Sequence, residues 1–174
     1  QRKKWWGNRE IAVCLSHDVD YVFKFDSLFR TTKSIVSLFL KHRDIKGVFF
    51  NLKRYLDTIF DYSKDPYWSF EYIIETEKKY GFFSSFYFLS EGTSKYDNCY
   101  LFDDRIKRLI FHIESLGFEA GYHGSYNSYD NIDLMSHEVK KINEFITKKP
   151  YGSRQHFLRF RVPHTWRNQE QNRV

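Results

Sequence analysis

Apolar residues alternate along the chain between short uninterrupted runs and stretches in which they recur every three or four positions. The short runs predict buried strands at 11–15, 82–89, 118–122 and 152–160. The stretches with helical spacing predict helices at 27–41, 46–60, 66–80, 103–117 and 131–149. Strands that alternate with helices are typical of parallel β-α-β units, so the pattern predicts an α/β fold over a single domain, residues 1–174.

The segment 21–80, between the first two strands, is longer than the connection of one strand to the next requires. We interpret it as a mainly helical insertion that either covers the functional site as a lid or packs outside the sheet. Packing is favoured because the apolar residues of its helices have the spacing of buried faces. They include Leu28 and Phe39 in one helix and Phe49 and Leu56 in the next.

Composition and charge narrow the class of protein. The high aromatic content of 20%, with only 8 Gly and 3 Pro, favours a packed globular chain. The formal net charge of +6 would suit nucleic-acid binding, but the basic residues alternate with acids and form no run longer than Arg2-Lys3-Lys4, so nucleic acid is not the expected partner. No apolar stretch is long enough for a transmembrane helix, and the N-terminus lacks the apolar core of a signal peptide. We therefore expect a soluble chain, with its compartment left open.

The two cysteines, Cys14 and Cys99, are far apart in the sequence and form neither a CxxC motif nor a disulfide framework. Cys14 lies within the first apolar run, so we expect it to be a small core residue.

Three polar clusters follow the ends of predicted strands: 16–20, 121–127 and 153–156. Since the carboxyl ends of parallel strands lie at one edge of a sheet, these clusters can converge. Aspartate and histidine together suit a divalent metal such as zinc, and a second carboxylate that does not bind the ion can act as a base. Arg154 would hold that base ionised through a bidentate ion pair.

Each of these residues also has a structural interpretation. Asp18 and Asp20 would cap a turn, His123 would be a hydrogen-bonded structural histidine, and Arg154 would be a surface charge. The aromatic residues Tyr151, Phe157 and Phe160 are interpreted as core rather than as a platform for sugar rings.

The order of the clusters resembles that of the NodB-homology polysaccharide deacetylases. The sequence Leu-Ser-His-Asp-Val-Asp at 15–20 is similar to their first motif, and 81–89 looks like their second strand. The sequence Glu-Ala-Gly-Tyr-His-Gly-Ser-Tyr at 119–126 resembles the second motif, and 153–160 resembles the third, which is built on an arginine. The resemblance covers residues 11–166 in the right order.

This resemblance implies a deformed (β/α) barrel, here truncated after about four strands where a closed barrel has about eight, with a helical insertion after the first strand. It also implies a metal-dependent hydrolase, most readily with zinc, that removes N- or O-linked acetyl groups from a glycan. Asp18 matches the general base, Arg154 the arginine that orients it, and Asp20 and His123 two metal ligands.

The sequence departs from the family pattern in two places. Asn127 stands where a second histidine ligand is expected, and His156 or His17 are the candidates to replace it. The histidine acid of the family comes from later strands, which do not occur before Val174. A relative that binds glycan without turnover is therefore the main alternative, and a basic nucleic-acid-binding module is a more distant one. The open sheet edges predict either a homo-oligomer or further chain that covers them.

Overall fold

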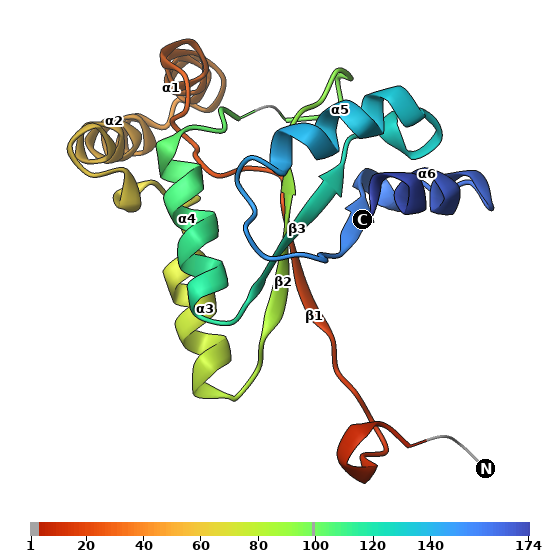
Figure 1. Cartoon of the computed structure of the whole chain (residues 1–174). Helices are drawn as coiled ribbons and strands as arrows, with labels where there is room; N and C mark the ends of the chain where they lie inside the picture. Colours follow the sequence, from red (N-terminus) through yellow and green to blue (C-terminus); the bar gives the residue numbers. More distant parts are fainter. Residues whose placement is uncertain (1–3, 99) are drawn as a thin grey trace.

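The computed structural model describes residues 4–98 and 100–174 (Figure 1). Four strands are present in this part of the chain: β1 (Leu15–Val19), β2 (Ser84–Leu89), β3 (Glu119–Gly124) and β4 (Ser153–Gln155). The α-helices are α1 (Leu28–His42), α2 (Ile45–Phe60), α3 (Phe70–Lys79), α4 (Asp104–Ser115), α5 (Ile132–Ile142) and α6 (His164–Asn172). The predicted mixture of helices and strands is confirmed.

The strands form one parallel sheet in the order β1-β2-β3-β4, curved as half of a barrel. In its register Asp18 lies beside Tyr87, Leu89 beside His123, and His123 beside Arg154. All four carboxyl ends therefore lie at one edge of the sheet, as the alternating pattern predicts. The architecture is compatible with part of a β/α barrel, and the particular type of barrel stays a prediction.

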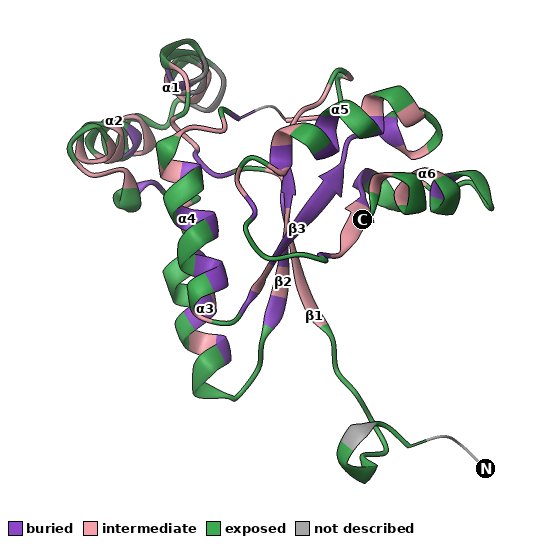
Figure 2. Cartoon of the chain, in the orientation of Figure 1, coloured by how far each residue is buried: buried purple, intermediate pink, exposed green. Residues whose placement is uncertain are grey.

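The hydrophobic core lies between β2 and β3 and the helices that cover them, where buried positions are concentrated (Figure 2). Phe70 of α3 packs against Phe86 and Phe88 of β2, with ring centroids 6.2 and 6.5 Å apart. The inner face of α4 contributes a stripe of fully buried aliphatic residues, among them Ile106, Ile110 and Ile113. This core holds the two central strands and so fixes the edge at which their polar ends meet.

The ends of the first and last strands differ from the prediction. β1 covers residues 15–19 rather than 11–15, and Ile11 and Val13 are exposed. Cys14 is exposed too, so its assignment to the core was wrong, while Cys99 lies outside the described residues. β4 stops at Gln155, because Phe157 and Leu158 take the left-handed conformation with φ of 57° and 53°, which ends an extended strand.

Capping residues define the two helices that were predicted best. The Asp103 side chain accepts hydrogen bonds from the backbone N–H groups of Arg105 and Ile106, and Gly117 ends the turn after α4 with φ of 88°. Asn131 accepts from the N–H of Leu134 at the start of α5. α5 ends at Ile142 instead of 149, so only its start was predicted well. α3 begins at residue 70 instead of 66, and α6 was not predicted because its sequence is polar without an apolar stripe.

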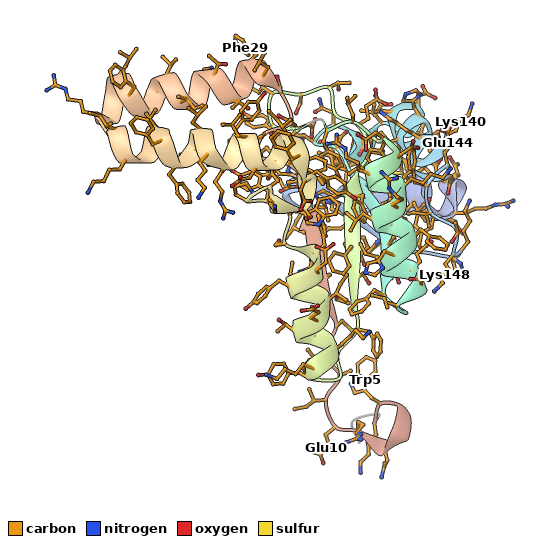
Figure 3. The ribbon with its side chains drawn as sticks, turned by 90° about the vertical axis from the view of Figure 1, so that its left-hand side faces the viewer. Trp5, Glu10, Phe29, Lys140, Glu144 and Lys148 are labelled. Carbon is orange, nitrogen blue, oxygen red and sulfur yellow. The ribbon has the colours of Figure 1, made fainter. Side chains whose placement is uncertain are left out.

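The insertion is divided between two environments. α3 packs against the sheet, whereas α1 and α2 form a helical hairpin that projects from the rest of the molecule (Figure 3). Leu28 and Phe39 of α1 are 69% and 56% exposed, and Phe49 and Leu56 of α2 are 68% and 49% exposed. The expectation that these apolar sides are buried was therefore wrong. No helix in the described ranges has the length and apolar character needed to cross a bilayer.

Candidate metal site

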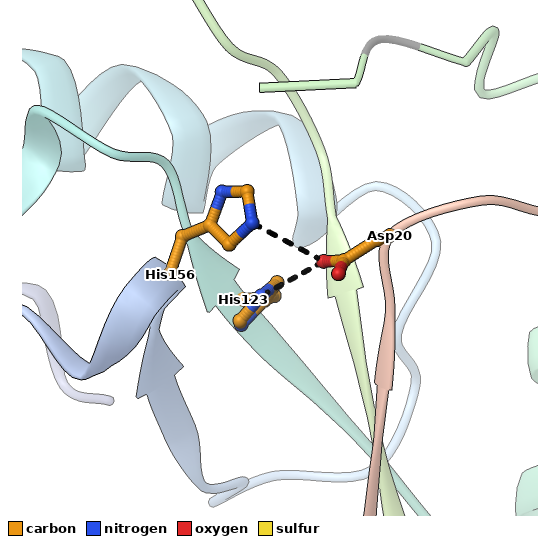
Figure 4. A group of neighbouring side chains, drawn as sticks. All are labelled: Asp20, His123 and His156. Carbon is orange, nitrogen blue, oxygen red and sulfur yellow. Dashed lines mark ion pairs between the residues drawn. The ribbon is translucent and has the colours of Figure 1, made fainter. Parts of the chain in front are cut away.

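Three side chains from different strand ends converge at the carboxyl edge of the sheet (Figure 4). Asp20 directly follows β1, His123 is the second-last residue of β3, and His156 directly follows β4. Nε2 of His123 lies 3.2 Å and Nε2 of His156 lies 3.6 Å from the same oxygen, Oδ1 of Asp20. One ligand atom from each residue lies within 4.8 Å of the others, so this group can hold a metal ion.

The hydrogen bonds behind the two imidazoles determine which nitrogen faces the site. Nδ1 of His123 lies 3.0 Å from the carbonyl oxygen of Arg154, which can only accept, so Nδ1 carries the proton in the neutral ring. Nδ1 of His156 lies 3.2 Å from the carboxylate of Asp97, and the same assignment follows. Both Nε2 atoms therefore present lone pairs toward the Asp20 carboxylate, an arrangement that binding of a cation stabilises.

Burial makes this juxtaposition of acceptors costly without a cation. His123 and His156 are only 1% and 7% exposed. Oδ1 of Asp20 and Nε2 of His123 are buried without a hydrogen-bond partner, because their geometry is not that of a hydrogen bond although they are 3.2 Å apart. Two unpaired acceptors that face each other fit a divalent ion. The Asp20 side chain is 38% exposed, which leaves an approach from solvent.

The charge state of Asp20 suits a metal ligand. When the two imidazoles carry a second proton, the close contact with His123 lowers the pKa of the Asp20 carboxyl below its usual value, against the opposing effect of partial burial, and the positive charges of His123 and His156 act in the same direction. Asp20 is therefore ionised at neutral pH.

Asp97 holds His156 in place and was not identified from the sequence. Its side chain is fully buried and accepts from the backbone N–H groups of Tyr126 at 2.7 Å and Ser94 at 3.0 Å, besides the imidazole of His156. Burial opposes ionisation of Asp97, but these hydrogen bonds outweigh it and lower the pKa of the carboxyl. Carboxylates that orient metal-binding histidines in this way are common. The only available signal was an aspartate in the loop after the second strand.

Two further buried groups fix the strand ends. The Tyr100 hydroxyl donates to the carbonyl of Val19 at 2.9 Å and accepts from the N–H of Leu89 at 3.0 Å, which ties the end of β1 to β2 next to Asp20. Glu138 of α5, also fully buried, accepts from the Tyr122 hydroxyl and from the N–H of Ser125, on either side of His123. Burial raises the pKa of the Glu138 carboxyl.

The predicted base and its arginine lie together. Nη1 of Arg154 is 3.0 Å from Oδ1 of Asp18, so the expected ion pair is present across a sequence separation of 136 residues. The pair is not bidentate, because Nη2 of Arg154 donates instead to Ser16 Oγ at 2.6 Å. Asp18 and Asp20 alternate with Val19 along the strand direction and so point to the same face of the sheet.

Two of the predicted alternative ligands lie elsewhere. His17 points to the opposite face, where its Nε2 lies 2.7 Å from Glu77 Oε1, so it cannot complete the group around Asp20. Asn127 is exposed and its Oδ1 lies 3.4 Å from Nη1 of Arg159, outside the group of three. His156 is the residue that the structure brings to Asp20 and His123.

Aromatic residues surround the outer side of His156. The Phe157 ring lies 4.6 Å from the His156 ring and 5.6 Å from that of Tyr126, which in turn lies 4.5 Å from Tyr96. Phe157 is 63% exposed and Tyr96 44%. Phe160 is exposed as well, so only Tyr151 of the three residues assigned to the core is buried.

Comparison of the chain with protein-family models, with curated proteins and with solved structures finds no match. The fold and the site define an α/β protein with an Asp-His-His group, its two histidines buried, at the carboxyl edge of a parallel sheet. What this group does must therefore be argued from its geometry.

Proposed function

We propose that this protein is a metal-dependent hydrolase that removes N- or O-linked acetyl groups from a glycan. The observation that carries the proposal is the convergence of two imidazole lone pairs on the Asp20 carboxylate, next to the ion pair of Asp18 and Arg154. Three protein ligands with an open side are typical of catalytic metal sites, zinc sites among them. The order of the motifs supports acetyl groups on a sugar as the substrate.

The residues of the chain have separate tasks in this hydrolysis. An ion held by Asp20, His123 and His156 would polarise the acetyl carbonyl and lower the pKa of water. Asp18 takes a proton from the attacking water as its oxygen bonds to the carbonyl carbon, and Arg154 orients Asp18 through their ion pair. The bond from the carbonyl carbon to the sugar nitrogen or oxygen then breaks. Protonated Asp18 returns its proton to that atom, and acetate is released.

The surroundings of the site support a carbohydrate. The exposed rings of Tyr96 and Phe157, beside His156, offer flat apolar faces of the kind that pack against sugar rings. A pocket of about 260 Å³ has Arg154, which pairs with Asp18, together with Leu158 and Phe160 in its lining. Together they suggest a surface along which a chain of sugars passes the site.

Metal binding is tested first, by calorimetry of the metal-stripped protein with Zn²⁺, Fe²⁺ and Mn²⁺. We expect one ion per chain, and loss of that binding in Asp20→Ala, His123→Ala and His156→Ala. Asn127→Ala is the matched control and retains the ion, since Asn127 lies outside the group. Stoichiometric metal in Asp20→Ala would contradict the site.

Activity is tested by acetate release from oligosaccharides that carry N-acetyl or O-acetyl groups. Asp18→Asn is expected to keep the metal but to lower the rate by a factor of about 100 or more, because it lacks the base. If the loaded wild-type protein binds these oligosaccharides and releases no acetate from any of them, the glycan-binding alternative replaces the hydrolase.

A further inference from the structure

The hairpin of α1 and α2 presents many large apolar side chains to solvent. In α2 the exposed apolar residues recur every three or four positions and so form one stripe along the helix. They are Ile45, Phe49, Leu52, Leu56 and Ile59, which are 58%, 68%, 42%, 49% and 58% exposed. Away from this stripe, Asn51 is buried and receives a hydrogen bond from the ammonium group of Lys24 at the base of the hairpin.

α1 has an exposed apolar stripe of its own. Phe29, Val36 and Leu40 share one side of the helix and are 75%, 46% and 67% exposed. Single exposed apolar residues are ordinary on protein surfaces, but stripes along two consecutive helices are not. A partner that covers apolar side chains is therefore expected for this hairpin.

The same segment carries most of the net charge of the protein. Residues 28–60 contain seven Lys and Arg against two Asp, which gives +5 of the formal +6 of the chain. Lys46 and Lys53 lie along one edge of the α2 stripe, and Lys33 lies next to the stripe of α1. All three are exposed, and none makes an ion pair within the described ranges. The partner must therefore accept both apolar side chains and positive charge.

An anionic lipid surface meets both requirements. In a dimer formed through this hairpin, each copy would bring a net charge of +5, and the two would repel each other. A nucleic acid would match the charge but leave the stripes of Phe, Leu and Ile uncovered. Amphipathic helices with Phe and Leu on one side and Lys beside them lie in the plane of a membrane interface. The 16 residues of α2 would extend about 24 Å along that plane.

We propose that the α1–α2 hairpin docks this protein onto membranes that contain anionic lipids, with the α2 stripe inserted among the acyl chains. The hairpin follows the end of β1, so it leaves the molecule from the edge of the sheet that bears Asp20. The proposal uses no residue of the metal site and stands independently of the hydrolase activity.

Co-sedimentation with vesicles tests the proposal on the full chain. Wild-type protein is expected to sediment with vesicles of phosphatidylcholine and phosphatidylglycerol in a 7:3 molar ratio on the order of tenfold more strongly than with pure phosphatidylcholine. Replacing two stripe residues together, Phe49→Ser and Leu56→Ser, should weaken binding about tenfold or more without a change of charge. Lys46→Glu with Lys53→Glu should abolish the preference for the anionic vesicles.

Matched controls replace exposed residues of the same kinds outside the hairpin. Tyr72→Ser with Phe111→Ser removes rings that are 74% and 64% exposed, and Lys78→Glu with Lys79→Glu reverses two exposed charges of α3. Both controls should bind as the wild type does. Circular dichroism checks that every variant is folded.

Several outcomes would overturn the proposal. Wild-type protein that stays in solution with anionic vesicles would do so, as would equal binding by the stripe variant. Light scattering that shows a dimer, lost in the stripe variant, without vesicle binding would assign the hairpin to a second copy. Salt-sensitive RNA binding that the Lys46→Glu, Lys53→Glu variant loses, again without vesicle binding, would assign it to nucleic acid.

Discussion

At the scale of single residues, Asp97 should control how tightly the site binds its ion. Its carboxylate accepts from His156 and from two backbone N–H groups, and so fixes the orientation of that ring. We expect Asp97→Asn to weaken metal binding by about 10-fold to 100-fold, since the negative charge behind the imidazole is lost while the shape is kept. Calorimetric titration with Zn²⁺ measures this directly.

Asp130→Asn is the control for that substitution, because Asp130 pairs with Arg161 and does not contact the metal-binding group. It should retain the affinity of the wild type. An Asp97→Asn variant with unchanged affinity would show that His156 is oriented by other contacts. A lower melting temperature with unchanged affinity would assign Asp97 a structural role alone.

The residues of the site differ in how far the sequence predicts them. Asp18, Asp20, His123 and Arg154 follow from strand ends that meet at one edge, and the ion pair of Asp18 with Arg154 was predicted. His17 was considered as a ligand because Asn127 stands where a second histidine is expected. With β1 at 15–19, alternation puts His17 on the opposite face. Asp97 lies in an irregular loop, where no repeating sequence pattern indicates which way a side chain points.

At the scale of elements, the cap of α4 should contribute measurably to stability. Asp103 accepts from two backbone N–H groups at the helix start, so Asp103→Ala should lower the free energy of unfolding by about 1 kcal/mol at pH 7. Asp103→Asn should lose less, since asparagine caps nearly as well. Urea unfolding followed by circular dichroism gives both values.

The cap also predicts a pH dependence. Partial burial opposes ionisation of Asp103, but hydrogen bonds from Arg105 outweigh it and lower the pKa below the usual 3.8. A lowered pKa in the folded state stabilises the protein above about pH 3.8, and this contribution is lost as the pH falls further. The difference between wild type and Asp103→Ala should therefore shrink between pH 4 and pH 2. A constant difference would mean that ionisation of Asp103 is irrelevant to the cap.

The capped starts of α4 and α5 were predicted better than the ends of β1 and β4, for a physical reason. The caps Asp103 and Asn131 act on backbone groups two or three residues away, so the sequence contains both partners. A strand ends where its neighbour ends. Leu15 is the first residue of β1 because it pairs with Ser84, while the apolar residues before it have no strand beside them. The short β4 depends on the left-handed backbone at Phe157, for which a phenylalanine gives no indication.

At the scale of the whole molecule, the spacing of apolar residues predicts helices but not what covers them. The stripes of α1 and α2 have the same period as the buried stripe of α4, and only the tertiary structure separates the exposed from the covered ones. The basic charge likewise looked dispersed along the sequence, yet most of the net charge falls within residues 28–60. The formation of a homo-oligomer through the open sheet edges stays a prediction, which light scattering can test by measuring the oligomeric state.

The contacts at the base of the α1–α2 hairpin predict that the hairpin can be removed without unfolding the rest of the protein. Asp65 is buried and accepts from the N–H groups of Lys24 at 2.8 Å, Phe25 at 3.0 Å and Tyr67 at 2.9 Å, so it joins the segments on either side of the two helices. Phe23 stacks on Trp68 beside it, with ring centroids 5.4 Å apart. These contacts hold residues 23–25 against residues 65–68, and none of them involves α1 or α2.

Replacing residues 27–60 by a short Gly/Ser linker should therefore leave a folded protein. Its affinity for Zn²⁺ should stay within about twofold of the wild type, because Asp20, His123 and His156 keep all their contacts, whereas binding to anionic vesicles should disappear. Asp65→Ala in the shortened chain is the control: it leaves the two N–H groups before the linker without their acceptor and should cost about 1–3 kcal/mol of stability. If the shortened chain unfolds while Asp65 is intact, the hairpin supports the fold itself, and its exposed stripes must be covered within the molecule in solution.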